Sequence, residues 1–257
     1  MSKREMYFNG SFYPAESKEI LRFITAFDDI KTLTEEHTPR AMIVPHAGYI
    51  YSGFTANLAY HLLPSDRRII VIGPSHRVAF EGISIALYDK YATPLGNLKI
   101  DRTYAEELQS RFEIAFAPEM HREHSTEVQM PFIKHYAPDA RVVEMVYGNY
   151  SPEKLSEIIA ALLQEKENIV VISTDLSHFY TEEVANELDT ICLHAIKEEK
   201  AKLLHEGCEA CGKIGVEGVI IAAKAAGLTS QLLDYRTSSW SSGDTSNVVG
   251  YTSAIFY

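Results

Sequence analysis

The sequence predicts a single α/β domain over residues 1–257, with a mainly parallel or mixed central sheet and helices on both faces. Short apolar runs of strand length alternate along the chain with helical patterns of roughly 10–15 residues, which is typical of successive β-α-β units. No linker, internal repeat or low-complexity tract interrupts this alternation. A length of 257 residues suffices for one large domain with a buried core.

The first β-α-β unit is expected between residues 40 and 76. The strings "RAMIVPH" (40–46) and "RRIIVIGPSH" (67–76) are short apolar runs closed by turn residues, as in buried strands. Between them, residues 52–63 repeat apolar side chains at helical spacing, with Ser52 as the expected N-cap. Two parallel strands joined by such a helix form a right-handed crossover in nearly all known folds.

The rest of the chain continues this alternation. Ser151 followed by proline is a helix start, Gly227 is a helix end, and acidic residues begin the helix at 181–199. Further strands are expected at 82–87, 141–148, 168–174, 231–238 and 247–257. Further helices are expected at 100–112, 125–137 (disturbed at Pro131), 151–166, 181–199 and 215–227, with a flexible connection at 239–246.

The charge balance excludes some classes of function. Lys and Arg number 24 against 35 Asp and Glu, so the formal net charge is −11. Nucleic-acid backbones and anionic membrane surfaces are bound through clustered cations, so neither is an expected partner. No apolar run approaches the roughly 18 residues of a spanning helix, and "MSKREMYFNG" lacks the apolar core of a signal peptide. We expect a cytoplasmic protein.

The three cysteines are Cys192, Cys208 and Cys211. An odd count in a chain of this size is not typical of a disulfide framework. Cys208 and Cys211 form a C-x-x-C pair, which without a second pair is weak evidence for a zinc or redox site. The role of this pair is left open.

Two histidines follow the strands of the first unit, His46 after 40–46 and His76 after 67–76. The carboxyl ends of parallel strands meet at one edge of the sheet, where ligands bind in open α/β folds. The two strands lie about 5 Å apart if they pair directly and about 10 Å apart if one strand separates them. Paired imidazoles at such an edge are typical metal ligands. The alternative is that each histidine caps its strand by bonding to loop backbone.

The same edge is expected to collect further polar side chains. They are Asp175 and His178 after 168–174, His121, Glu123 and His124 before 125–137, and Cys211 before 215–227. A helix N-terminus and nearby cations would lower the pKa of the Cys211 thiol and favour the thiolate. Taken singly, Asp175 or Glu123 is more typical of a helix cap or a solvated turn than of a functional site. Repetition of one arrangement after three strands favours a common site.

Several strings together resemble the Memo (mediator of cell motility) family, whose prokaryotic members are called AmmeMemoRadiSam system protein B. They occur in order over residues 10 to 257, essentially the whole chain, and several are long. They are "GSFYPA", "VPHAGYIYSG", "GPSH", "TPLGNLKID", "EHSTEVQMPF", "STDLSHF", "CG" at 211–212 and the terminal "VGYTSAIFY".

This resemblance implies a fold similar to that of class III extradiol dioxygenases, which are non-haem iron enzymes. It assigns His46 and His76 as metal-binding histidines and Cys211 as the third ligand. It places Asp175, His178 and His124 at the pocket as catalytic residues, with His178 as the acid/base oriented by Asp175. The string "CGKIGV" departs from the family pattern, since Gly215 replaces an expected proline and would leave the Cys211 loop less rigid.

A set of two imidazoles and one thiolate leaves coordination positions open, as in catalytic rather than structural metal sites. Thiolate shifts the metal preference toward iron, copper or zinc and away from magnesium. The resemblance to non-haem iron enzymes makes iron the expected cofactor, with copper and zinc as alternatives. The first functional hypothesis is therefore a metal-dependent oxidoreductase, resembling a dioxygenase, that acts on an unknown small substrate, for which an aromatic compound is one candidate.

The alternative hypothesis is a non-enzymatic adaptor that holds a peptide or ligand in the same pocket. Animal Memo proteins are described as binding a phosphotyrosine-containing receptor peptide. Phosphate would require a cationic rim, for which the motif loops supply only Arg77, Arg122 and Lys213. The prokaryotic family name also implies radical-SAM and AMMECR-like partner proteins, which suit either hypothesis. Assembly into a homo-oligomer is left open.

Overall fold

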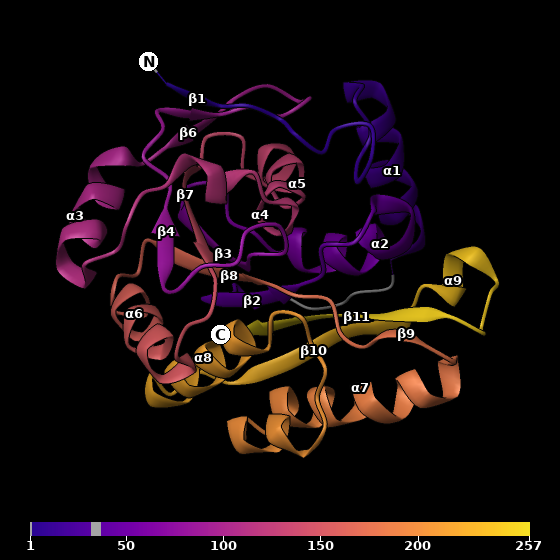
Figure 1. The fold of residues 1–257 in the computed structure, drawn as a ribbon. Coiled ribbons are helices and arrows are strands. Elements are labelled where there is room, and N and C mark those ends of the chain that lie inside the picture. Colours follow the sequence, from indigo (N-terminus) through magenta and orange to yellow (C-terminus); the bar gives the residue numbers. More distant parts are fainter. Residues whose placement is uncertain (1, 32–36) are drawn as a thin grey trace.

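A computed structural model describes residues 2–31 and 37–257. Its strands are β1 (Lys3–Arg4), β2 (Ala41–Val44), β3 (Arg68–Pro74), β4 (Ile83–Ile85), β5 (Lys90–Tyr91), β6 (Leu98–Ile100), β7 (Arg141–Tyr147), β8 (Asn168–Ser173), β9 (His178–Tyr180), β10 (Ser230–Thr237) and β11 (Val248–Phe256). In the described part of the chain they join in the order β1-β5-β6-β7-β3-β8-β2-β11-β10, with β4 beside β7 and β9 beside β11 (Figure 1).

Helices cover the sheet on both faces. They are α1 (Ser17–Ile30), α2 (Tyr49–Tyr60), α3 (Arg102–Phe112), α4 (His124–Glu127), α5 (Met130–Tyr136), α6 (Pro152–Gln164), α7 (Glu182–Lys197), α8 (Lys213–Ala225) and α9 (Ser239–Ser242), with 3₁₀ turns η1 (Pro118–His121) and η2 (Ala201–Glu206). None of the helices in the described residues combines the length and apolar character needed to cross a membrane.

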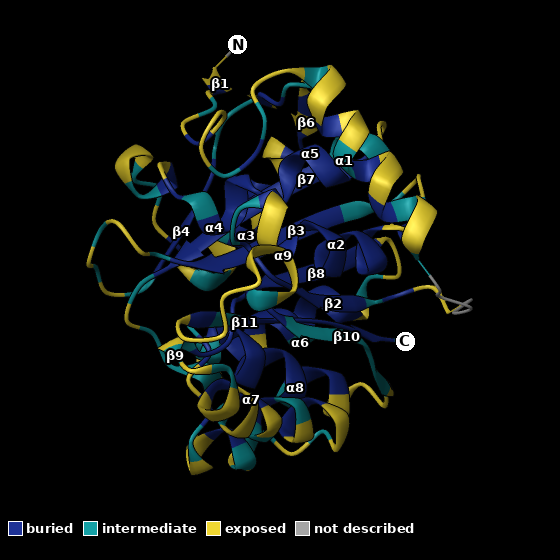
Figure 2. Cartoon of the chain, turned by 90° about the vertical axis from the view of Figure 1, so that its right-hand side faces the viewer, coloured by how far each residue is buried: buried dark blue, intermediate teal, exposed yellow. Residues whose placement is uncertain are grey.

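The centre of the sheet is parallel and buried on both faces. Strands β7, β3, β8 and β2 run parallel, whereas β11 pairs antiparallel with β2 and with β10. In β3, Ile70 and Ile72 face the core shared with α6 and α8, while Ile69 and Val71 face the core shared with α1 and α2. Successive side chains of a strand point to opposite faces, which is why this strand reads as one continuous apolar run. Figure 2 shows this buried sheet between its helical layers.

The predicted α/β class is confirmed, and the sheet is the mixed form of it. Strand β8 lies between β2 and β3, so one strand separates the two strands of the first β-α-β unit. The short outer strands β1, β5 and β6 were not predicted, because two or three residues show no periodicity. Helix α1 was also missed, although its buried residues recur at helical spacing.

Two local predictions were wrong. Ser52 is not an N-cap, because α2 begins at Tyr49 with Gly48 at the cap position. Ser52 is instead buried, and its hydroxyl donates to the carbonyl of Ala47. The connection at 239–246 contains a short helix, α9, whose Trp240 ring packs 5.6 Å from the ring of Phe54.

The expectation against disulfides was wrong as well. Cys192 of α7 and Cys208, which follows η2, form a disulfide with their Cα atoms 5.0 Å apart. The turn at η2 folds the chain back onto α7, a contact that residue spacing alone does not reveal. Cys211 is the free cysteine, so Cys208 and Cys211 are not a zinc-binding or redox pair in this structure.

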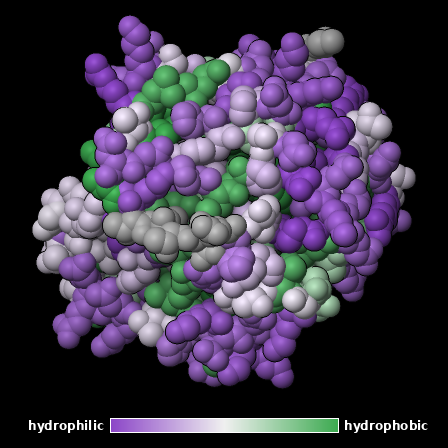
Figure 3. Space-filling model, turned by 180° about the vertical axis from the view of Figure 1, so that it is seen from behind, coloured by the Kyte–Doolittle hydropathy of each residue, from purple (hydrophilic) through white to green (hydrophobic). Residues whose placement is uncertain are grey.

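The surface is mainly hydrophilic on the face seen from behind. On the face opposite to that of Figure 1, hydrophilic residues predominate and hydrophobic residues reach the surface in separate areas between them (Figure 3).

Candidate metal centre

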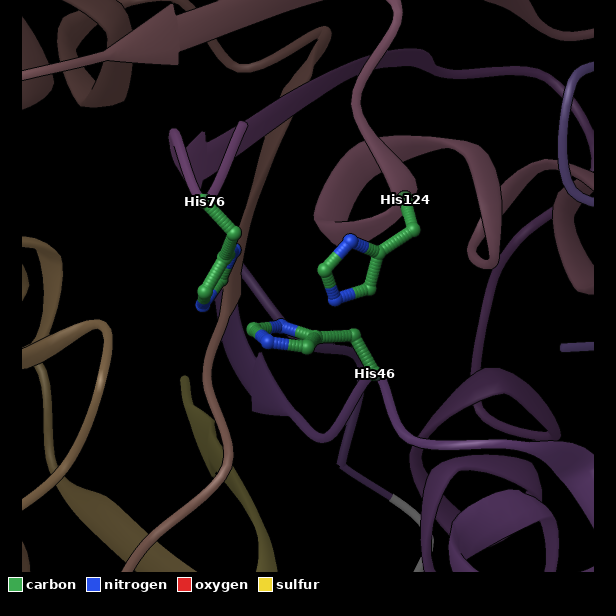
Figure 4. A group of neighbouring side chains, drawn as sticks. All are labelled: His46, His76 and His124. Atoms are coloured by element: carbon green, nitrogen blue, oxygen red, sulfur yellow. The ribbon is translucent and has the colours of Figure 1, made fainter. Parts of the chain in front are cut away.

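Three histidines from distant segments converge at the carboxyl edge of the parallel strands. His46 follows β2, His76 follows β3, and His124 begins α4. One ligating nitrogen from each ring lies within 4.8 Å of the others, and the rings face a common gap (Figure 4). The ring centroids of His46 and His76 are 5.0 Å apart, and that of His124 is 5.4 Å and 4.7 Å from them.

Hydrogen bonds behind His46 set the tautomer of its ring. The Ser173 hydroxyl donates its only proton to the carbonyl of Ser125 at 2.6 Å and also accepts from the Gln129 side chain at 3.0 Å. It can therefore only accept from Nδ1 of His46, which lies 2.8 Å away. That bond places the proton on Nδ1 and leaves the lone pair of Nε2 available, as metal-ligating histidines require.

Glu123 holds the other two histidines. Its Oε1 lies 2.9 Å from Nδ1 of His124 and 3.4 Å from Nδ1 of His76, and its Oε2 accepts from the main-chain N–H of His76 at 2.7 Å. The same carboxylate caps α4 by accepting from the N–H of Ser125, a role that sequence analysis had considered for Ser125 itself. Carboxylates in this position orient metal-binding imidazoles and raise their basicity.

The pKa values of these groups suit cation binding. Burial, together with the neighbouring His76 and His124, lowers the pKa of His46 well below its usual value, so the ring is neutral at neutral pH. Burial alone would raise the pKa of Glu123, but hydrogen bonds from His124 and His76 outweigh it and hold that pKa well below the usual range. Neutral imidazoles backed by an ionised carboxylate are the form in which histidines bind metals.

Cys211 lies beside this cluster, with its Sγ 3.4 Å from Nε2 of His46. Among the described residues, the ligand atoms that all lie within 4.8 Å of one another are those of the three histidines. Cys211 is not part of this group. The prediction of a lowered thiol pKa was wrong, since burial and the charge of Asp175 raise the pKa of Cys211 to about 12. The main-chain N–H of Asp175, which donates to Sγ at 3.3 Å, offsets this only in part.

Close packing places the Cys211 segment. A Cβ at Gly212 would lie 2.6 Å from Cβ of Thr174 and 2.7 Å from the carbonyl oxygen of Ser173, so only glycine fits after this cysteine. Gly215 lies within the first turn of α8 rather than in a loop, and its N–H donates to the Tyr147 hydroxyl at 3.2 Å. The expected loss of rigidity at Gly215 is therefore not seen.

Asp175 and His178 lie at the same edge. Asp175 was expected to orient His178, but in the part of the chain that the structure describes no hydrogen bond joins their side chains. Oδ1 of Asp175 instead accepts from the main-chain N–H groups of His46 at 2.7 Å and of Ala47 at 3.3 Å. Burial raises the pKa of Asp175 despite these bonds. Asp175 thus fixes the loop that carries His46, while His178 stands in β9 at the wall of the adjoining cavity.

A cavity of about 530 Å³ opens next to the cluster. Two of the three clustered histidines, His46 and His76, do not reach its wall, while His124 does. The residues that line the cavity are Phe12, Ala47, Gly48, Tyr51, His124, Asp175, His178, Phe179, Ser238, Ser242, Asp244, Asn247, Val249 and Tyr251.

The N-terminal segment is tied down beside His124 by a buried ion pair. Arg4 and Glu127 are 1% and 0% exposed, and their charged atoms lie 2.6 Å apart. Glu127 also accepts from the N–H groups of Tyr7 and Phe8 and from the Tyr13 hydroxyl. This arrangement presses the Phe12 ring against His124, with centroids 4.4 Å apart.

Sequence analysis considered Glu123 mainly as a cap and did not single out Ser173, Gln129 or Glu127. Glu123 had a signal, because it directly precedes His124 in "EHS". Ser173 and Gln129 lie within the strings "STDLSHF" and "EHSTEVQMPF", but their neutral side chains gave no chemical reason to single them out.

We expect Glu123→Gln to lower metal affinity about 10–100-fold, the usual effect of losing a partner behind a ligating histidine. The amide keeps the size of the side chain but presents an N–H group or a single oxygen to two imidazole Nδ1 atoms. Competition with a chromophoric chelator measures the affinity. Glu119→Gln, at an exposed position of η1, serves as the matched control. Equal affinities for the two variants would contradict an orienting role for Glu123.

The fold and the site define a class of protein: a mixed α/β sheet whose parallel strands end in a histidine cluster beside a cavity. Comparison with known proteins makes the assignment narrower. The model of the Memo-like protein family matches residues 4–255, and the chain belongs to this family.

Similar proteins support the assignment over full length. MEMO1 family proteins of Methanobrevibacter smithii and Archaeoglobus fulgidus are 36% and 32% identical to the chain, each covering 96% of it and 97% of their own length. That of Aquifex aeolicus is 31% identical over both whole chains. The crystal structure of the uncharacterized protein JW3007 from Escherichia coli K12 shares the fold, with a TM-score of 0.60 at 13% identity, covering 85% of this chain and 100% of that one.

Proposed function

We propose that this Memo-family protein is a metal-dependent oxidoreductase that binds iron at the histidine cluster and acts on a small substrate in the adjoining cavity. Copper is the alternative metal with redox chemistry, and zinc would supply a Lewis acid instead. The observation that carries the proposal is the convergence of three imidazoles within 4.8 Å, each with its Nδ1 turned toward a protein partner.

The residues present fit a metal ion. His46 and His76 belong to either candidate ligand set, and the third ligand is Cys211, as the family resemblance implies, or His124. Either set would supply three protein ligands, the number typical of catalytic rather than closed structural metal sites. Bound iron would supply redox chemistry with dioxygen and a chelating substrate, as in the class III extradiol dioxygenases that the family is expected to resemble.

The protein's own side chains would position the substrate and move protons. His178 lies in the cavity wall, where we propose that it acts as a general acid or base. Asp175 holds the His46 loop in place through its two main-chain bonds. The Phe12 ring, packed on His124, shields one side of the cluster from water.

The raised pKa of Cys211 bears on the choice of third ligand. A buried thiol with a pKa of about 12 is protonated at neutral pH, so its coordination would release a proton on metal binding. The radical-SAM and AMMECR-like partners implied by the family name remain part of this proposal, since they are compatible with an enzyme or an adaptor.

The test is anaerobic purification without a metal-affinity tag, followed by metal analysis of the wild type, Cys211→Ala and His124→Ala. We expect near-stoichiometric metal in the wild type and loss in the variant that lacks the third ligand. Loss in Cys211→Ala alone identifies a His/His/Cys site, and loss in His124→Ala alone identifies three histidines. Dioxygen uptake by the metal-loaded protein with phenolic substrates then tests the oxidoreductase. A wild type that stays free of metal under iron, copper and zinc loading would overturn the proposal.

A further inference from the structure

The cavity beside the histidine cluster lacks cationic side chains. Among the described residues that line it there is no Lys or Arg, while the carboxyl groups of Asp175 and Asp244 are both present. The guanidinium groups of Arg77 and Arg122 lie over the Phe8 and Tyr7 rings instead. Phosphate and carboxylate ligands are held mainly by Arg and Lys, so the cavity is not built for an anionic ligand body.

Aromatic rings make up much of the remaining wall. Phe12, Tyr51, Phe179 and Tyr251 all line the cavity. Two of them are exposed, Tyr51 at 42% and Phe179 at 75%. A phenylalanine that remains three-quarters exposed contributes little to the core, so its ring is free to contact a ligand.

The backbone of Phe179 is also held in an unfavourable conformation. Its φ is +66°, in the left-handed region, which is a genuine outlier for a bulky residue. Pairing of β9 with β11 on both sides, His178 with Val249 and Tyr180 with Val248, keeps it there. Strain of this kind persists only where the surrounding structure imposes it, and it is concentrated at ligand clamps and active sites.

Asp244 supplies an ionised carboxylate at the same wall. Its Oδ1 accepts from the N–H and the hydroxyl of Ser246 at 2.8 and 2.7 Å, and these bonds lower its pKa. Exposure leaves the group accessible to a ligand. A carboxylate beside exposed aromatic rings is the combination that recognises organic cations, since ring faces attract a cation within about 6 Å.

We propose that the cavity selects a small organic cation, whose ammonium or guanidinium group contacts Asp244 and the ring faces of Phe179 and Tyr51. This specificity rests on the proposed function in one respect: the opposite end of the ligand points to the histidine cluster and would be the reacting end. Phosphorylated peptides are disfavoured, because the described residues that line the cavity include no Lys or Arg to pair with a phosphate.

The test compares three probes that share one ring and differ in charge: benzyltrimethylammonium, benzyl alcohol and benzyl phosphate. Isothermal titration calorimetry measures their affinities. Fluorescence of Trp240, the one tryptophan of the chain and a neighbour of the lining residues Ser238 and Ser242, is a second readout. We expect the cation to bind about 10-fold more tightly than the alcohol, with the phosphate weakest.

Two variants locate the contact. Phe179→Leu removes the ring face and Asp244→Asn removes the charge, and each should weaken binding of the cation about 3–10-fold. Asp244→Asn should leave benzyl alcohol unaffected. Glu183→Gln, at an exposed acidic position outside the cavity lining, is the matched control. Circular dichroism confirms that each variant is folded. Equal binding of the phosphate and the cation, or unchanged cation affinity in both variants, would overturn the proposal.

The same titrations on chelator-treated protein separate this proposal from the proposed function. If the protein takes up no metal and still prefers the cation, the cation site is supported and the proposed oxidoreductase function is rejected. If the protein binds metal but shows no preference among the three probes, the cation site is rejected and the proposed oxidoreductase function is retained.

Discussion

Replacing Glu127 by alanine is expected to lower the free energy of unfolding by about 3–5 kcal/mol, the range that follows removal of one partner from a buried ion pair. Arg4 would remain almost fully buried without its nearest carboxylate. The N–H groups of Tyr7 and Phe8 and the hydroxyl of Tyr13 would lose their acceptor as well. Buried donors without an acceptor add to the loss.

Chemical denaturation followed by circular dichroism measures this effect. Glu107→Ala, at an exposed position of α3, is the control and should change stability by about 0.5 kcal/mol or less. The double variant Arg4→Met/Glu127→Gln should be more stable than Glu127→Ala, because it removes the unpaired charge and keeps an acceptor for the two N–H groups. A loss below about 1 kcal/mol in Glu127→Ala would show that the ion pair does not anchor the N-terminal segment.

His46→Ala is expected to abolish metal binding, with an affinity loss well beyond the roughly 10–100-fold of an outer partner. His46 is the buried member of the cluster and belongs to both candidate ligand sets. Its ring is also the one whose tautomer is set by Ser173. Without His46, each candidate set keeps only two of its three ligands: His76 with Cys211, or His76 with His124.

Elemental analysis of protein loaded anaerobically with iron and then desalted gives the readout. His61→Ala, which removes a part-exposed histidine at the end of α2, should retain the metal content of the wild type. Stability should be followed in parallel, so that unfolding is not mistaken for ligand loss. A folded His46→Ala protein with wild-type metal content would place the metal elsewhere.

Much of the fold was predictable because its central strands obey a simple rule. Strands such as β3 and β8 are apolar on both faces, and the carboxyl ends of parallel strands must lie at one edge. That rule brought His46 and His76 together without knowledge of strand order. The position of β8 between β2 and β3 was not predictable, since pairing between distant segments leaves no local signal.

The rest of the site depends on packing. The position of Cys211 just before α8 suggested a lowered thiol pKa. Burial raises that pKa instead, and residue spacing does not show burial. The Cys192–Cys208 disulfide and the Arg4–Glu127 pair join residues 16 and 123 positions apart through tertiary contacts. Glu123 and His124 were expected at this edge, but the contact of the Glu123 carboxylate with His124 and His76 could not be read from their spacing.

The place of β2 in the sheet has a consequence for biosynthesis. Its neighbours are β8 and β11, which a ribosome makes long after residues 41–44. A nascent chain that already contains His46, His76 and His124 therefore lacks the strands that hold His46 in position. A metal site that includes His46 would therefore assemble only after β11 has been synthesised, and an ion captured earlier would not meet this geometry.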